Sequence, residues 1–254
     1  MRAPLPKALR DLPVAHRALH DPAAGRVENS PAAIAAAIAA GYAIEIDLQP
    51  AADGTPMVFH DYDLGRLTGQ PGPIRGRSVA ELTNTRLTGS SDTIPTLAQV
   101  LDQVAGRVPL LIEIKDQHGQ MGADTGGFEA RVAKVLAGYD GPVAVMSFNP
   151  HSVAHFAAAC PDLPVGLTTG SYDPEDYAPL SPAVCNHLRE IPDFDPDLHS
   201  FISHEAGDLA RPRVSQIKAS GAAILCWTIR SPKAEAEARR IADNITFEGY
   251  AAPL

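Results

Sequence analysis

The sequence has few cysteines and no long apolar run. Its three cysteines, Cys160, Cys185 and Cys226, are odd in number and far apart, so a disulfide framework is not expected and a reducing compartment fits. Cys226 lies in an apolar run, which indicates a buried thiol. No segment approaches the length of a membrane span, and the N-terminus has no apolar signal-peptide core. We therefore expect a soluble, cytoplasmic protein without membrane insertion.

Positive charge is also scarce. The chain has 21 Lys and Arg against 30 Asp and Glu, a net charge of -9, which argues against a nucleic-acid backbone or an anionic membrane as partner. A small anionic substrate stays possible, because a bound metal can reverse the local field. The sequence contains no P-loop, dinucleotide fingerprint, G-x-S-x-G elbow or HExxH motif. The expected partner is a small molecule.

What the sequence does contain is an alternation of strands and helices. Nine strands are predicted, at residues 14–18, 43–49, 56–61, 109–115, 143–148, 165–169, 201–205, 223–229 and 245–248. Helices are predicted between most of them, including one that starts near Pro174. The strand at 56–61 has no helix before it and reads as part of an inserted hairpin. The other eight predict an α/β fold, a closed (β/α)₈ TIM barrel.

The length fits a single domain over residues 1–254, with an insertion at about 50–92 that caps the barrel mouth. Active sites of such barrels lie at the C-terminal ends of the strands. Chemically useful residues occur at those ends on four predicted strands: His16-Arg17, Glu45-Asp47, Glu113-Lys115 and Trp227.

Glu45 and Asp47 are the first pair of interest. Strand side chains alternate, so these two share a face. Adjacent carboxylates repel and are costly to bury without a counter-charge, and a hard divalent cation such as Mg²⁺ or Ca²⁺ would remove that cost. The Asp53-Gly54 turn predicts a hairpin that brings His60 beside Asp47. The alternative is a solvated strand face with a hairpin histidine.

Glu113 and Lys115 form a second pair on one strand face, within the apolar segment LLIEIK. Glu113 would be a third carboxylate ligand for the cation. Zinc is disfavoured, because no cysteine or paired histidine at ligand spacing is evident. The alternative for this pair is a buried or rim salt bridge.

His16 and His60 are candidates for a general acid and base, because histidine titrates near neutrality. Arg17 offers a planar fork for a phosphate oxygen. Trp227, the single tryptophan, is expected either in the core or lining the pocket. The remaining histidines are taken as structural, with His204 as the one to watch because it lies on a barrel strand. The glycine-rich loop at 119–127 favours a plain surface loop over a mobile lid.

The ordered set of motifs resembles the glycerophosphodiester phosphodiesterase family. The matching pieces cover nearly the whole chain: His16-Arg17, Glu28-Asn29-Ser30, Glu45-x-Asp47, the Asp53-Gly54 turn, His60-Asp61, Leu64-x-Arg66-x-Thr68, Ile94-Pro95-Thr96-Leu97, Glu113-Ile114-Lys115, Ser147-Phe148 and Trp227-Thr228. The resemblance implies a barrel with a small insertion, a divalent cation, and hydrolysis of glycerophosphodiesters to an alcohol and glycerol 3-phosphate. It implies that His16 and His60 are the acid and base. It also assigns the metal to Glu45, Asp47 and Glu113, and phosphate contacts to Arg17 and Lys115.

Three departures from the family pattern stand out. Ala18 replaces the usual glycine after His-Arg, the spacing from His16 to Glu28 is longer, and the last strand reads NITFEGY in place of an ending in Thr-Asp. None removes a proposed catalytic group, so they bear on substrate identity more than on reaction type.

Two rivals to hydrolysis remain open. One is a phospholipase-C-like barrel that stops at a cyclic phosphate, and the other is a barrel that binds a phosphorylated ligand without turning it over. The sequence does not decide whether the nucleophile is water or a neighbouring hydroxyl of the substrate.

Overall fold

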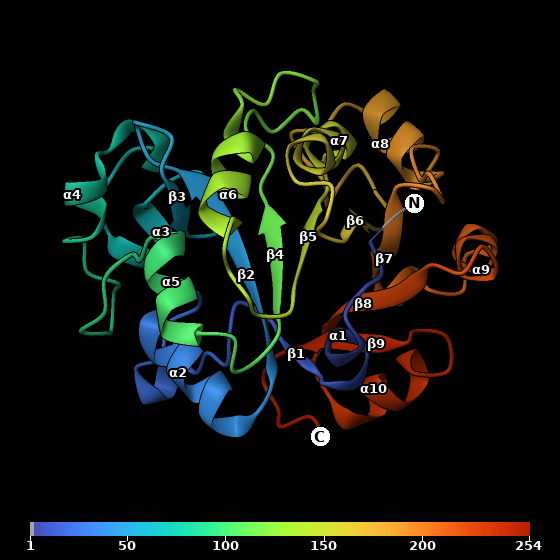
Figure 1. The fold of residues 1–254 in the computed structure, drawn as a ribbon, viewed down its shortest axis with the longest axis horizontal. Helices are drawn as coiled ribbons and strands as arrows, with labels where there is room; N and C mark the ends of the chain where they lie inside the picture. The colour runs from blue at the N-terminus through green and yellow to red at the C-terminus, as the bar shows by residue number, and fades with distance from the viewer. Residues whose placement is uncertain (1–2) are drawn as a thin grey trace.

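Eight parallel strands close into a barrel in the computed structural model, which describes residues 3–254. They are β1 (Val14–Ala15), β2 (Ala43–Pro50), β4 (Leu110–Ile114), β5 (Val143–Ser147), β6 (Val165–Thr169), β7 (His199–Glu205), β8 (Ala223–Ile229) and β9 (Asn244–Phe247). The barrel closes because β1 pairs with both β2 and β9. The predicted TIM barrel is confirmed (Figure 1).

Helices on the outside connect the strands. They are α2 (Pro31–Ala40), α5 (Leu97–Val104), α6 (Phe128–Leu136), α7 (Pro150–Ala159), α8 (Pro182–Arg189), α9 (Pro212–Ala219) and α10 (Pro232–Ala238), with short 3-10 turns η1 (Pro22–Ala24) and η3 (Ala206–Asp208). Several begin with a Ser-Pro or Asn-Pro pair. At Ser30, for example, the side chain accepts a hydrogen bond from Ala33 N, while Pro31 occupies the first helical position. The sequence thus marks these helix starts by itself.

Strand alternation divides the apolar residues between two cores. Outward side chains such as Ile44, Ile46 and Ile112 pack against the helices. Inward side chains such as Leu111 and Phe201 fill the lower half of the barrel. The N-terminal helix α1 (Lys7–Asp11) adds apolar residues to this inner core and so closes the bottom of the barrel. Polar chemistry is thereby confined to the upper, C-terminal half.

The segment between β2 and α5 forms the insertion, drawn in teal at the left of Figure 1. It contains β3 (Pro56–Val58), α3 (Gly65–Thr68), η2 (Ile74–Gly76) and α4 (Val79–Leu82). The strand β3 pairs antiparallel with the end of β2, outside the barrel, which is the hairpin predicted from the Asp-Gly turn. A small apolar cluster of its own holds the insertion together. This anchored hairpin carries His60 to the barrel mouth.

One predicted helix is wrong. Residues near Pro174 form turns, and the helix of this connection, α8, begins at Pro182. The stronger start signal lies there, because the Ser181 side chain accepts a hydrogen bond from Val184 N and Pro182 follows it. The thiol of Cys226 is buried as predicted, and all three cysteines are free. None of the helices within residues 3–254 has the length and apolar character needed to cross a membrane.

The inner core predicts a sensitive position at Gly166 on β6. A Cβ there would lie 2.6 Å from two ring carbons and the carbonyl oxygen of Phe201. We expect Gly166→Ala to destabilise the fold by about 1–3 kcal/mol, because overpacking forces the neighbours apart. Thermal unfolding measures this, with Gly122→Ala as the control, since nothing lies within 4 Å of a Cβ at Gly122. Equal melting temperatures for both variants would contradict this account of the inner core.

Candidate active site

A cavity of about 200 Å³ opens at the C-terminal end of the barrel. It is lined by all eight residues that the sequence analysis selected: His16, Arg17, Glu45, Asp47, His60, Glu113, Lys115 and Trp227. They come from four barrel strands or strand ends and from the insertion. The barrel therefore brings together in one site groups that are up to 211 positions apart, from His16 to Trp227.

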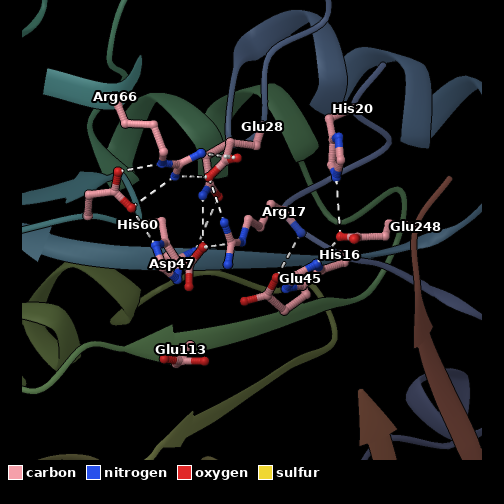
Figure 2. A network of polar contacts seen from close by, with 12 residues as sticks. His16, Arg17, His20, Glu28, Glu45, Asp47, His60, Arg66, Glu113 and Glu248 are labelled. Carbon is pink, nitrogen blue, oxygen red and sulfur yellow. Dashed lines mark hydrogen bonds and ion pairs between the residues drawn. The ribbon is translucent and has the colours of Figure 1, made fainter. Parts of the chain in front are cut away.

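Three carboxylates form the acidic side of this cavity. Glu45 and Asp47 lie on β2, and Glu113 lies beside Asp47 on β4, at the same level of the sheet. The three are almost completely buried, with exposed fractions of 2%, 2% and 6%. One oxygen of each lies within 4.8 Å of the others, and Figure 2 shows them on the two neighbouring strands. The arrangement could hold one oxygen-coordinated cation.

The two carboxylates of β2 have different electrostatic surroundings. Burial, together with the nearby charges of Asp47 and Glu113, raises the pKa of Glu45 well above its ordinary value. Asp47 is equally buried, yet Lys115, His60 and Arg17 hold its pKa well below the usual range. Within residues 3–254, no Lys, Arg or His nitrogen lies at ion-pair distance from Glu45. Glu45 is thus the carboxylate that most lacks a positive partner.

Lys115 bridges the carboxylates of the two strands. Its Nζ lies 2.6 Å from Glu113 Oε1 and 3.3 Å from Asp47 Oδ1. Burial alone would lower the pKa of this ammonium group, but the two carboxylates raise it above its ordinary value. Lys115 therefore stays charged and offers a fixed positive group on the cavity wall.

Arg17 supplies a second positive group to the cavity, besides Lys115. Its Nη1 donates to Glu28 Oε1 at 2.8 Å, and its Nε lies 3.6 Å from Asp47 Oδ2. Its backbone N–H donates to Glu45 Oε2 at 2.8 Å. Arg17 and Ala18 both have left-handed backbone angles, with φ of 52° and 64°. A positive φ favours glycine, and at position 18 of this chain an alanine adopts it.

His16 is held by a carboxylate that sequence reasoning did not select. Its Nδ1 lies 2.5 Å from Glu248 Oε2, just after β9. Contacts with His16 and His20, and a 2.7 Å bond from Arg230 Nε, keep the pKa of Glu248 well below its usual range. An ionised carboxylate only accepts hydrogen bonds, so Nδ1 of His16 carries the proton and Nε2 is the nitrogen for proton transfer. Burial lowers the pKa of His16, and Glu248 partly offsets this.

His60 is held in the same way from the insertion. Its Nδ1 lies 2.7 Å from Asp61 Oδ1. Arg66 donates to both oxygens of Asp61 and to both oxygens of Glu28, and Glu28 in turn binds Arg17. Figure 2 shows this chain of polar contacts linking the insertion to the barrel. Although burial opposes ionisation of Asp61, the contacts with His60 and Arg66 lower its pKa strongly.

Sequence reasoning missed the carboxylate partners of both histidines. The signal that could have identified Glu248 is its position at the C-terminal end of an apolar strand, where NITFEGY replaces the usual Thr-Asp ending of the family pattern. His20 was also overlooked: His16, His20 and Glu248 place one donor atom each within 4.8 Å of one another. Glu248 also forms an ion pair with Arg230, which already compensates its charge. We therefore interpret His16, His20 and Glu248 as a hydrogen-bond network around His16.

Trp227 lines the cavity through its ring. Its Nε1 donates to Ser203 O at 3.0 Å, so the indole nitrogen is already used within the fold. The ring packs edge-on against Phe148, with centroids 5.4 Å apart. By contrast, His204 faces outward, where its Nδ1 bonds Thr169 Oγ1 at 2.8 Å. His204 is therefore a structural histidine.

Hydrogen bonds to Asp116 hold the start of the glycine-rich loop after β4. One oxygen of Asp116 accepts backbone hydrogen bonds from His118, Gln120 and Met121. Its other oxygen accepts from Asn149 Nδ2 at 2.7 Å. These bonds support the reading as an ordered surface loop.

Comparisons with known proteins show which proteins this chain is similar to. The Bacillus subtilis (strain 168) protein YhdW, whose name assigns it provisionally to the glycerophosphodiester phosphodiesterases, is 26% identical over 204 residues, covering 76% of each chain. An Oleispira antarctica phosphodiesterase, solved with the product sn-glycerol-3-phosphate, is 25% identical with a TM-score of 0.71, covering 95% of this chain and 94% of that one.

A glycerophosphodiester phosphodiesterase from Thermotoga maritima has the same fold, with a TM-score of 0.66 at 22% identity and coverage of 93% and 94%. The profile of the glycerophosphoryl diester phosphodiesterase family matches residues 16–245, nearly the whole barrel. The chain therefore belongs to the glycerophosphoryl diester phosphodiesterase family.

Proposed function

We propose that this member of the family hydrolyses glycerophosphodiesters to glycerol 3-phosphate and an alcohol with the help of a divalent cation, Mg²⁺ or Ca²⁺. The observation that carries the proposal is one cavity that holds three buried carboxylates and two carboxylate-bound histidines. The product complex of the Oleispira antarctica relative supports the same substrate class.

The carboxylates fit a hard cation. Glu45, Asp47 and Glu113 supply oxygen donors from two adjacent strands, and burial together with the neighbouring negative charges raises the pKa of Glu45. A cation held there would act as a Lewis acid that neutralises charge on the phosphate. We infer that these three residues are its ligands.

The positive side chains and the histidines do the remaining work. Arg17 and Lys115, both already charged and held by carboxylates, bind the non-bridging phosphate oxygens. One of His16 and His60 accepts a proton from the nucleophile, and the other donates a proton to the leaving alcohol oxygen. Their partners, Glu248 and Asp61, fix Nδ1 as the protonated nitrogen in each ring. The nucleophile is either water or the neighbouring hydroxyl of the glycerol.

We also infer a single domain with its insertion and a place in the cytoplasm, in the turnover of glycerol-containing lipid fragments. Three free thiols, Cys160, Cys185 and Cys226, support a reducing compartment. The insertion supports the single-domain reading, because its Arg66 binds Glu28 of the barrel.

Removing either histidine tests the acid–base pair. We expect His16→Ala and His60→Ala each to lower kcat by about 10²–10⁴-fold on glycerophosphodiesters with metal supplied. His187→Ala, on the exposed side of α8, serves as the matched control and should keep the wild-type rate. Phosphorus NMR of the product distinguishes glycerol 3-phosphate from a cyclic phosphate. Near-normal turnover by both site variants would exclude the pair.

Cation binding is measurable without activity. We expect Mg²⁺, Ca²⁺ or Mn²⁺ to raise the melting temperature of the wild-type protein, because a ligand that binds only the folded state stabilises it. The rise should disappear with chelator and shrink in Glu45→Gln, which removes one donor charge. A rise of equal size in Glu45→Gln would show that the cation binds elsewhere.

The contact between Glu248 and His16 predicts a change in pH dependence. We expect Glu248→Gln to lower kcat by about 10–100-fold, because the ring loses its charged orienting partner. Glu248 raises the pKa of His16 against the effect of burial, so its neutralisation lowers that pKa. The limb of the pH–rate profile that reports His16 should therefore move to lower pH.

Glu237→Gln is the control, since Glu237 is exposed and pairs with Arg240 on the outer surface. An unchanged rate and profile in Glu248→Gln would remove Glu248 from the mechanism.

A further inference from the structure

Three buried hydroxyls lie on barrel strands other than the two that carry the carboxylates. Thr168 on β6, Ser203 on β7 and Thr246 on β9 have exposed fractions of 2%, 0% and 1%. Their side-chain oxygens have no hydrogen-bond partner among residues 3–254. Buried hydroxyls are normally paired, so three unpaired ones within one barrel call for an explanation.

Strand alternation points these hydroxyls inward. Thr168 and Ser203 are register partners on adjacent strands, and their outward neighbours Leu167 and Ile202 pack against the helices. Thr246 likewise follows the outward-facing Ile245. Thr168 and Thr246 both line the cavity that contains Glu45, Asp47 and Glu113. The carboxylates lie on β2 and β4, and the two hydroxyls flank them, with Thr168 two strands beyond β4 and Thr246 two strands beyond β2.

The neighbouring threonine provides a contrast on the same strand. Thr169 faces outward, and its Oγ1 pairs with His204 Nδ1 at 2.8 Å. On the inner face, the ring N–H of Trp227 is already bonded to Ser203 O. The fold therefore satisfies the outward hydroxyl and leaves the inward ones for another molecule.

We propose that Thr168 and Thr246 bind the free hydroxyl groups of the glycerol half of the substrate, with Ser203 beside Thr168 as a secondary contact. This subsite rests on the proposed phosphodiesterase function and deepens it. A hydroxyl both donates and accepts, so it complements the vicinal diol of a glycerol group.

Depth and size also favour the glycerol half over the leaving alcohol. The barrel interior below the hydroxyls is closed by apolar residues, including Leu225 and Phe201. The cavity, at about 200 Å³, fits a three-carbon unit with a phosphate. The variable alcohol would then point to the open mouth, where the exposed Arg230 lies.

The test compares ligands with and without the diol. Binding of sn-glycerol 3-phosphate and of inorganic phosphate is measured by calorimetry, with Mg²⁺ present, for Thr168→Val, Thr246→Val and the double variant. Each substitution keeps the shape and removes one hydroxyl. We expect each to weaken glycerol 3-phosphate by about 3- to 10-fold, the range of one neutral hydrogen bond. Inorganic phosphate should bind within about 2-fold of wild type, since its own contacts lie elsewhere.

Stability supplies an independent readout. Removing an unpaired buried hydroxyl should leave the melting temperature of the free protein unchanged or raise it. The matched control is Thr169→Val, which removes the hydrogen-bond partner of His204 Nδ1 and should lower the melting temperature while keeping wild-type preference for glycerol 3-phosphate over phosphate. The same two measurements on all variants separate a ligand-binding hydroxyl from a structural one.

Each result decides the proposal. Variants of Thr168 and Thr246 that lose affinity for glycerol 3-phosphate alone support the subsite. Equal loss for both ligands, or no loss, overturns it while wild-type hydrolysis of glycerophosphodiesters continues. Absence of hydrolysis in the wild-type protein with every cation tested would instead overturn the proposed function on which the subsite rests.

Discussion

Negative charge packed into the mouth of the barrel is the constraint around which the site is organised. Glu45, Asp47 and Glu113 are buried side by side, an arrangement that is unfavourable unless positive charge compensates it. Lys115 and Arg17 supply part of that compensation within the fold. The remaining imbalance falls on Glu45, and a cation bound beside it would offset that charge.

Two ion-pair systems then hold the two histidines that we propose as acid and base. Arg66 and Glu28 join the insertion to the start of the barrel, so His60 and Arg17 are positioned by one network. Glu248 does the corresponding work for His16. The insertion is therefore part of the active-site framework, because its hairpin brings in one histidine and its arginine locks that histidine's partner.

The barrel and the primary site could be predicted from sequence because each depends on local patterns. The alternation of strand side chains predicted that Glu45 and Asp47 share a face of one strand and that Glu113 and Lys115 share a face of another. The alternation of eight strands with helices predicted the barrel. The partners Glu248 and His20 could not be found this way, since their roles depend on how the barrel closes at β1. The helix expected near Pro174 is wrong for another reason: the chain forms turns there, and Ser181 supplies the N-cap with which the helix of this connection begins. Unpaired hydroxyls such as Thr168 are likewise visible only in three dimensions.

The pairing of His16 with Glu248 has a consequence for the order in which the site forms during biosynthesis. These residues are 232 positions apart, one at the end of the first barrel strand and the other just after the last. A nascent chain leaving the ribosome can form its acidic cluster once β4 has emerged, but it gains an oriented first imidazole only when β9 docks. Catalytic power should thus arise as one of the final events of biosynthesis, after the remaining scaffold is already in place.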